Sequence, residues 1–106
     1  MKYILLHGMG QKASIWDKTI SYLTNKAEIV PLELSDFFSE GDCTYSKMYA
    51  SFCDYCNNIS KPLNLCGLSL GAVLALNYAM DFPQKVNSLV LIAPQYDIVN
   101  RGGFYE

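Results

Sequence analysis

The sequence is poor in charge, in histidine and in long apolar runs, and each shortage excludes a class of protein. Charged residues make up 17% of the chain against 51% hydrophobic residues, the reverse of the balance found in disordered proteins. Eight basic against ten acidic side chains give a net charge of −2. That charge provides no surface for nucleic acid or for an anionic membrane.

Signals for a membrane or for secretion are also missing. No apolar run approaches the roughly 20 residues that a membrane-spanning helix needs. At the N-terminus, His7 and Gly8 interrupt the apolar residues 3–6, which are too few for a secretory signal peptide. Four cysteines are too few and too irregularly spaced for a secreted disulfide framework: Cys43, Cys53, Cys56 and Cys66. We therefore expect a cytoplasmic protein without membrane or nucleic-acid partners.

The 106 residues suit a single domain in which strands and helices alternate. Short apolar runs predict four strands, at residues 3–6, 28–34, 63–68 and 86–93. Because proline has no N–H, Pro31 predicts an edge position for the second strand. The long connections between these strands allow parallel pairing. The sequence therefore predicts a three-layer α/β fold, with a four-stranded, mostly parallel sheet and helices on both faces.

Three helices are predicted between the strands. Apolar residues at helical spacing place them from Ser14 to about Asn25, from about Thr44 to Asn58, and from Leu70 to Met80. Ser14 and Asp17 have the spacing of a capping box at the start of the first helix. The third helix is apolar nearly all round, which predicts that it is buried, and the loop at residues 35–43 separates the second strand from the second helix.

The strongest chemical signal is the run Gly67-Leu68-Ser69-Leu70-Gly71, which ends a predicted strand and opens a helix. This is the G-x-S-x-G pattern of a nucleophile elbow. The two glycines leave room where larger side chains would collide across a sharp turn. The pattern predicts Ser69 as a nucleophile at a helix N-terminus, where developing negative charge is stabilised.

A second signal is the loop His7-Gly8-Met9-Gly10, directly after the first strand. Acyl transfer needs two N–H donors for its oxyanion, one from the residue after the nucleophile and one from a glycine-rich loop on a neighbouring strand. The pattern predicts the backbone N–H groups of Leu70 and Met9 as the donors, with Gly10 as an alternative to Met9. Glycines allow such a loop to turn its N–H groups inward.

These residues together resemble the N-terminal half of an α/β-hydrolase, over residues 1–94. The resemblance rests on the His7–Gly10 loop, on Trp16, on the CGLSLGA run around Ser69, and on Phe82-Pro83 before the fourth strand. It implies the strand order second, first, third, fourth, with His7 shaping the oxyanion loop. It also implies an esterase- or lipase-like serine hydrolase that acts on a small ester-type substrate without a cofactor or metal.

The chain departs from the family pattern in two places. The loop after the second strand reads Glu33-Leu34-Ser35-Asp36-Phe37-Phe38 instead of D-x-x-G-x-G-x-S. In the family the triad acid and histidine follow the serine, whereas the only histidine here, His7, precedes it. We therefore expect residues 1–106 to be a partial domain that lacks the C-terminal strands, the lid and the triad acid and base. Because serine is a weak nucleophile without an imidazole base, we expect this partial domain to be inactive alone.

Other interpretations stay open. His7 is an alternative candidate for the base, and Asp97 is a candidate for an acid after the fourth strand. The run Gly8-Met9-Gly10-Gln11-Lys12-Ala13, with Glu33 some 20 residues on, also fits a dinucleotide-binding fingerprint. A non-catalytic binding domain that keeps the fold is a further interpretation. Cys53-x-x-Cys56 fits core packing better than a metal or redox site.

The fourth strand leads to an expectation about assembly. In the family fold this strand is paired on both sides, but no further strand is predicted after it here. An apolar strand with an open row of backbone groups is a template for pairing with another chain. We therefore expect self-association, most simply a two-fold dimer with antiparallel fourth strands. The alternative is a monomer in which residues 95–106 fold back over the edge.

Overall fold

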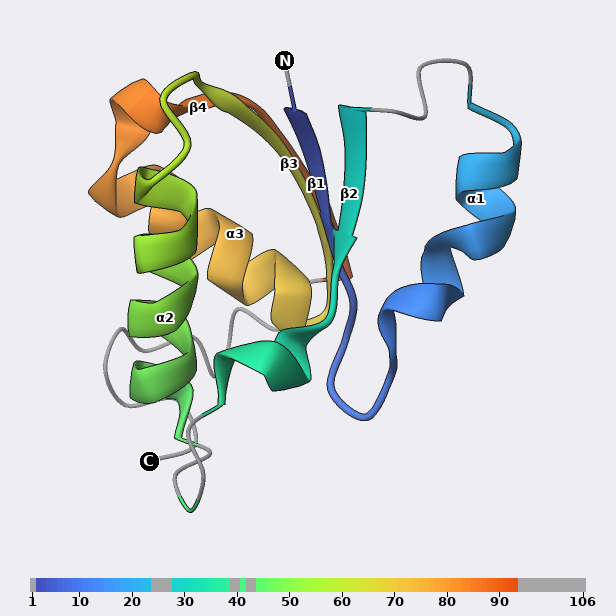
Figure 1. The fold of residues 1–106 in the computed structure, drawn as a ribbon, viewed down its shortest axis with the longest axis horizontal. Helices are drawn as coiled ribbons and strands as arrows, with labels where there is room; N and C mark the ends of the chain where they lie inside the picture. The colour runs from blue at the N-terminus through green and yellow to red at the C-terminus, as the bar shows by residue number, and fades with distance from the viewer. Residues whose placement is uncertain (1, 24–27, 39–40, 42–43, 94–106) are drawn as a thin grey trace.

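A computed structural model describes residues 2–23, 28–38, 41 and 44–93, and in it strands and helices alternate (Figure 1). The strands are β1 (Lys2–Leu6), β2 (Ile29–Leu32), β3 (Leu63–Leu68) and β4 (Val86–Ile92). The α-helices are α1 (Asp17–Ser21), α2 (Tyr45–Asn57) and α3 (Leu70–Asp81). Short 3₁₀ helices within the described ranges include η1 (Ala13–Trp16), η3 (Leu34–Phe37) and η4 (Pro83–Lys85).

All four strands are parallel and lie in the order β2-β1-β3-β4, which confirms the predicted fold class and strand order. β1 and β3 are neighbours in the middle of the sheet, with Leu6 opposite Gly67. The chain order reverses between these two strands, and α/β sheets bind ligands at such a point. The residues that follow β1 and β3 therefore lie side by side at the carboxyl ends of the strands.

Strand β2 lies at the edge of the sheet, as Pro31 predicted. Pro31 is opposite Leu5 of β1. The strand ends at Leu32, earlier than predicted, because the next residues turn into η3. Leu34, the first residue of η3, is buried, so part of the predicted loop at 35–43 belongs to a 3₁₀ turn that packs on the core.

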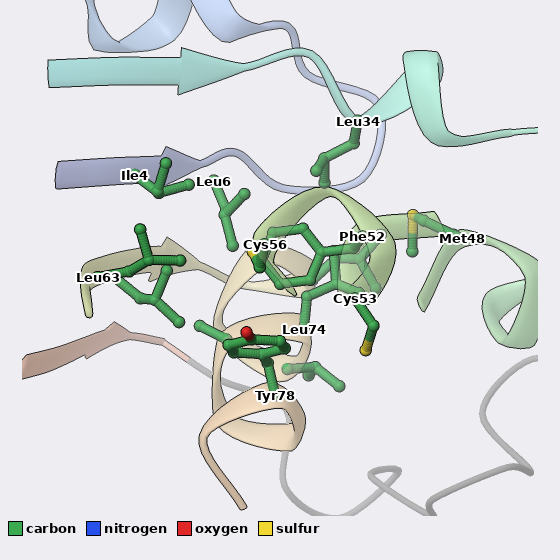
Figure 2. Close-up of a cluster of buried hydrophobic side chains, with 14 of the residues drawn as sticks. Ile4, Leu6, Leu34, Met48, Phe52, Cys53, Cys56, Leu63, Leu74 and Tyr78 are labelled. Carbon is green, nitrogen blue, oxygen red and sulfur yellow. The ribbon is translucent and has the colours of Figure 1, made fainter. Parts of the chain in front are cut away.

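Helices lie on both faces of the sheet, with α1 on one side and α2 and α3 on the other (Figure 1). The main core lies between the sheet and α2 and α3 (Figure 2). Its fully buried members include Ile4, Leu6, Phe52, Cys56, Leu63, Leu74 and Tyr78. Burial of a leucine or phenylalanine side chain contributes about 1.5–3 kcal/mol. This packing fixes β1, β3 and α3, the elements that carry the candidate site.

Helix α3 is buried along most of its length, as its apolar sequence predicted. The small residues Ala72 and Ala75 are fully buried, and the helix contacts β1, β3 and β4. It ends at Asp81, just before Phe82-Pro83. Close packing of α3 on β1 holds the start of the helix against the end of that strand.

Helix α2 also matches the prediction. Thr44 caps it, because the Thr44 side chain accepts a hydrogen bond from the Lys47 N–H at 3.3 Å. The predicted apolar stripe faces the core, with Met48 and Phe52 buried and Ile59 partly buried. A local cap and tertiary packing thus fix helix α2 together.

The first helix differs from the prediction. Residues Ala13–Trp16 form a 3₁₀ turn before α1, Lys12 occupies the N-cap, and the Lys12 side chain makes no capping hydrogen bond. The predicted capping box of Ser14 and Asp17 is therefore wrong. The physical reason is a distant acceptor, since the Ala13 N–H donates to Glu33 Oε1 at 3.0 Å. The predicted helix end at Asn25 lies outside the described residues.

Among the helices that the structure describes, none is both long and apolar enough to cross a membrane.

Candidate active site

Ser69 occupies a sharp turn between β3 and α3. Its backbone has φ 54° and ψ −113°, in a region that residues other than glycine rarely adopt. Hydrogen bonds hold this conformation from both sides. The Ser69 N–H donates to the Ile92 carbonyl at 2.9 Å, and the Ser69 carbonyl accepts from the N–H groups of Ala72 and Val73 at 3.0 and 3.2 Å. Hydrogen bonds to β4 and to α3 therefore stabilise the turn.

The two glycines of the elbow are required by close backbone contacts. A Cβ on Gly67 would lie 2.3 Å from the carbonyl oxygen of Gly71, across the turn. A Cβ on Gly71 would lie 2.4 Å from the Leu6 carbonyl oxygen and 2.7 Å from that of His7. The first contact is the collision across the turn that the sequence predicted, and the second shows that β1 also limits the site.

The His7–Gly10 loop lies directly beside Ser69. The Gln11 N–H donates to the Gly8 carbonyl at 3.2 Å, and Gly10 has φ +76°, which fits the third position of a type II turn. A Cβ on Gly8 would lie 3.3 Å from the Ser69 Cβ. The loop and the serine, 61 positions apart along the chain in the case of Gly8, are thus adjacent in space.

Gln11 fixes the same loop from within. Its Oε1 atom accepts a hydrogen bond from the Gly8 N–H at 2.7 Å. Because this N–H is already used, Gly8 cannot serve as an oxyanion donor. Sequence reasoning did not identify Gln11, since a glutamine three residues after a glycine is no recognisable signal.

His7 is buried and both of its ring nitrogens are engaged. Nε2 accepts a hydrogen bond from the Leu34 N–H at 3.0 Å, so Nε2 carries no proton and Nδ1 carries it. The Nδ1–H then donates to the Gly8 carbonyl at 2.8 Å. With no free acceptor on the ring, His7 cannot take a proton from Ser69 in this arrangement, and its position is that of a loop-shaping residue.

Glu33 links the loop after β1 to the end of β2. One carboxylate oxygen accepts from the Ala13 N–H, and the other lies 3.3 Å from His7 Nε2. The dinucleotide interpretation required Glu33 to bind a ribose and the start of the following helix to bind a diphosphate. Because the Glu33 carboxylate itself lies at the start of η1, a diphosphate there would meet negative charge, and the structure does not support that interpretation.

A cavity of about 290 Å³ lies beside the loop that follows β1. Residues 7–12 and 33–35 form most of its wall, together with Phe38 and Leu70. Met9 and Leu70, the two residues predicted to supply oxyanion donors, line the same cavity. This volume is near the lower end of the range for small-molecule sites, about 300–1,000 Å³.

Cys53 and Cys56 belong to the core. Cys56 is fully buried in the core and Cys53 nearly so, and burial raises the pKa of the Cys56 thiol to about 12. Burial also raises the pKa of the Cys66 thiol, on β3. Core packing of Cys56 is thereby confirmed. Within the described ranges, no group of three His, Cys, Asp or Glu side chains is placed to hold a metal ion.

Two predicted residues fall outside what the structure describes. They are Cys43 and Asp97, the possible acid after the fourth strand.

Comparisons with known proteins agree with the fold. The model of the family described as "alpha/beta hydrolase fold" matches residues 4–101. A pimeloyl-[acyl-carrier protein] methyl ester esterase of Nitrosomonas europaea is 24% identical over 98 residues, covering 92% of this chain and 39% of the esterase. A monoacylglycerol lipase of Xenopus laevis is 27% identical over 101 residues, covering 86% of this chain and 29% of the lipase.

One solved structure has the same fold. It is an extracellular α/β-hydrolase from a Paenibacillus species, with a TM-score of 0.70 at 21% identity. The match covers 89% of this chain and 40% of the hydrolase. This chain therefore spans well under half the length of each of these proteins.

Proposed function

The chain belongs to the α/β-hydrolase fold family, and from this premise we propose that it carries the nucleophile and the oxyanion donors of an esterase-type serine hydrolase. Ser69 is the nucleophile, and the substrate is a small molecule with an ester-type bond. The esterase and lipase among the similar proteins support this substrate class. The cavity of about 290 Å³ that Met9 and Leu70 line offers space for a small molecule beside the proposed donors.

The observation that carries the proposal is the backbone of Ser69. A residue other than glycine at φ 54° costs on the order of 1–3 kcal/mol, and such strain gathers at functional sites. Packing does not require it, because a glycine at position 69 would adopt the same turn at lower cost. The strain is explained if the turn must present a hydroxyl group at the end of β3.

The proposed oxyanion donors are the N–H groups of Leu70 and Met9. Leu70 is the first residue of α3, whose N-terminal end favours negative charge. The Gly8 N–H is taken by Gln11, which leaves Met9 as the proposed donor on the loop, with Gly10 as the alternative. Removal of one such donor in a serine hydrolase costs about 10²–10³ in kcat, so both are central to the proposal.

The proposal places the triad acid and base outside the described residues, because His7 is fully engaged. Residues 1–106 alone should therefore turn over activated esters very slowly. Serine proteases that lack a member of the triad retain only about 10³–10⁴-fold catalysis over water, through binding and the oxyanion hole. A comparable residual effect is expected here.

Hydrolysis of p-nitrophenyl acetate, with and without added imidazole, tests this. We expect little turnover alone, and an imidazole-dependent rate that exceeds that of the Ser69→Ala variant. Robust turnover without imidazole that is lost in Ser69→Ala but kept in His7→Ala would show that an unrecognised base is present. Equal imidazole-dependent rates for the chain and Ser69→Ala would refute the role of Ser69.

A second candidate is a non-catalytic binding domain. One observation favours it, namely that the cavity lies next to a serine whose only neighbouring histidine cannot accept a proton. Acetyl transfer separates the two candidates. An acetyl group found on Ser69 after the imidazole reaction supports the hydrolase, whereas ester binding without any acetylation of Ser69 supports the binding domain.

A further inference from the structure

Strand β4 presents an outer edge that the described part of the chain leaves unpaired. β4 lies at the end of the sheet order, and within the described residues it pairs with β3 alone. Its sequence, Val-Asn-Ser-Leu-Val-Leu-Ile, contains no charged residue and no proline. Natural edge strands usually carry such residues because they prevent pairing with other chains.

The hydrogen bond at the elbow shows which backbone groups of β4 face outward. The Ile92 carbonyl accepts from the Ser69 N–H, so the backbone groups of Ile92 point toward β3. Because the direction alternates along a strand, those of Val90 also point toward β3. Leu89 and Leu91 therefore direct their N–H and C=O groups to the outer edge. These are the groups that a partner strand can bind.

The side chains of β4 alternate between the two faces of the sheet. Leu89 and Leu91 pack against the core on the side of α2 and α3. Val90 and Ile92 lie on the opposite face and are 52% and 42% exposed. They neighbour Cys66 and Leu68 of β3, so the outer edge continues into an apolar strip. An uncharged edge and an apolar strip create no repulsion between two identical copies.

We propose that two copies of this chain pair through the outer edges of β4, antiparallel about a two-fold axis at Val90. In this register Leu89 of each copy is opposite Leu91 of the other and exchanges both hydrogen bonds with it. All the outward groups of Leu89 and Leu91 are then satisfied. The Val90 side chains face each other as a non-hydrogen-bonded pair, the closest kind in an antiparallel ladder.

The opposite edge of the sheet does not offer the same surface. β2 is shorter than β4 and contains Pro31, which has no N–H to donate. Pairing of β4 with β2 of another copy would also build an open chain of molecules. Pairing of β4 with itself closes at two copies, as most homo-oligomeric interfaces do.

Sedimentation equilibrium over a concentration series gives the first test. The chain should approach twice its mass of 11.9 kDa as concentration rises. Val90→Lys should remain a monomer, because it places two like charges opposite each other at the axis. Met80→Lys is the matched control, since Met80 is 54% exposed and belongs to α3 and not to β4, and it should dimerise like the wild type. Dimerisation of Val90→Lys, or a wild type that is monomeric throughout, would overturn the proposal.

Amide hydrogen exchange on the unmodified chain gives a second test that does not depend on a variant. The Leu89 and Leu91 amides should become protected as concentration rises, while the Val90 amide is protected at every concentration. Protection of Leu89 and Leu91 that does not vary with concentration would mean that the chain covers its own edge, and would overturn the dimer.

Disulfide trapping tests the register and remains informative if Val90→Lys fails to fold. Val90→Cys is made in a Cys66→Ser background, because Cys66 lies beside Val90 within one copy. Cysteines in a directly opposed pair fall within the distance range of a disulfide, whereas a shift of the register separates them. A trapped dimer on oxidation supports the axis at Val90, and its absence under conditions that oxidise free thiols would refute it.

Discussion

Replacement of Gly71 with alanine should weaken the fold, although the same change inside a helix ordinarily strengthens it. Helix propensity alone favours alanine over glycine by about 1 kcal/mol. At Gly71, however, the new Cβ would lie 2.4 Å from the Leu6 carbonyl oxygen and 2.7 Å from that of His7. Both atoms belong to the backbone of the neighbouring chain segment, so they cannot rotate away. The helix and β1 must separate.

The magnitude follows from two opposing contributions. Overpacking costs about 1–3 kcal/mol, and the rigid contacts place Gly71→Ala at the upper end of that range. After subtraction of the propensity gain, the net loss is about 2 kcal/mol. In a domain of this size a loss of 1 kcal/mol lowers the melting temperature by about 4–8 °C, so a decrease of about 8–16 °C is expected.

Thermal unfolding followed by circular dichroism measures this change. Ala79→Gly, the opposite substitution at a half-buried position of the same helix, is the control. It should cost about 1 kcal/mol through propensity alone. If Gly71→Ala instead melts at or above the wild-type temperature, no close contact exists between α3 and β1, and the description of the elbow is wrong.

Two further predictions concern buried groups. His7→Ala leaves the buried Leu34 N–H without its acceptor and should cost about 1–3 kcal/mol in urea unfolding; an unchanged midpoint would contradict the His7 contacts. Because burial raises the pKa of Cys56 from 9.0 to about 12, its contribution to stability is complete below pH 9.0 and is lost as the pH rises from there toward about 12. The melting temperature should fall across that interval, less steeply in Cys56→Ala, and equal slopes would contradict this cause.

The sequence predicted the elbow and the sheet well because both depend on local patterns. The glycines at positions 67 and 71 are two residues from Ser69 on either side, and the clash that Gly67 avoids lies within that short turn, whereas the one that Gly71 avoids is with the end of β1. The strands were recognised because buried parallel strands are continuous apolar runs. Pro31 identified an edge strand through a simple property, the missing N–H.

The parts that could not be predicted depend on contacts between distant segments. The cap at Ala13 comes from Glu33, 20 residues away, and it replaces the local capping box expected at Ser14. The acceptor of the Leu34 N–H is His7, 27 positions earlier in the chain. Neither pairing produces a periodic pattern in the sequence, because each depends on how the carboxyl ends of β1 and β2 lie beside each other in the fold.

The reactivity of Ser69 toward a fluorophosphonate, in the folded chain and in the urea-unfolded chain, tests the central claim most directly. The serine oxygen attacks the phosphorus with loss of fluoride, the tetrahedral adduct resembles the intermediate of acyl transfer, and peptide mass spectrometry locates the adduct. If the elbow and the oxyanion donors are preformed, the folded chain should label Ser69 faster, by up to about 10³-fold. Labelling of Ser69 at the same rate in the folded and unfolded chains would contradict the assignment of Ser69 as a nucleophile.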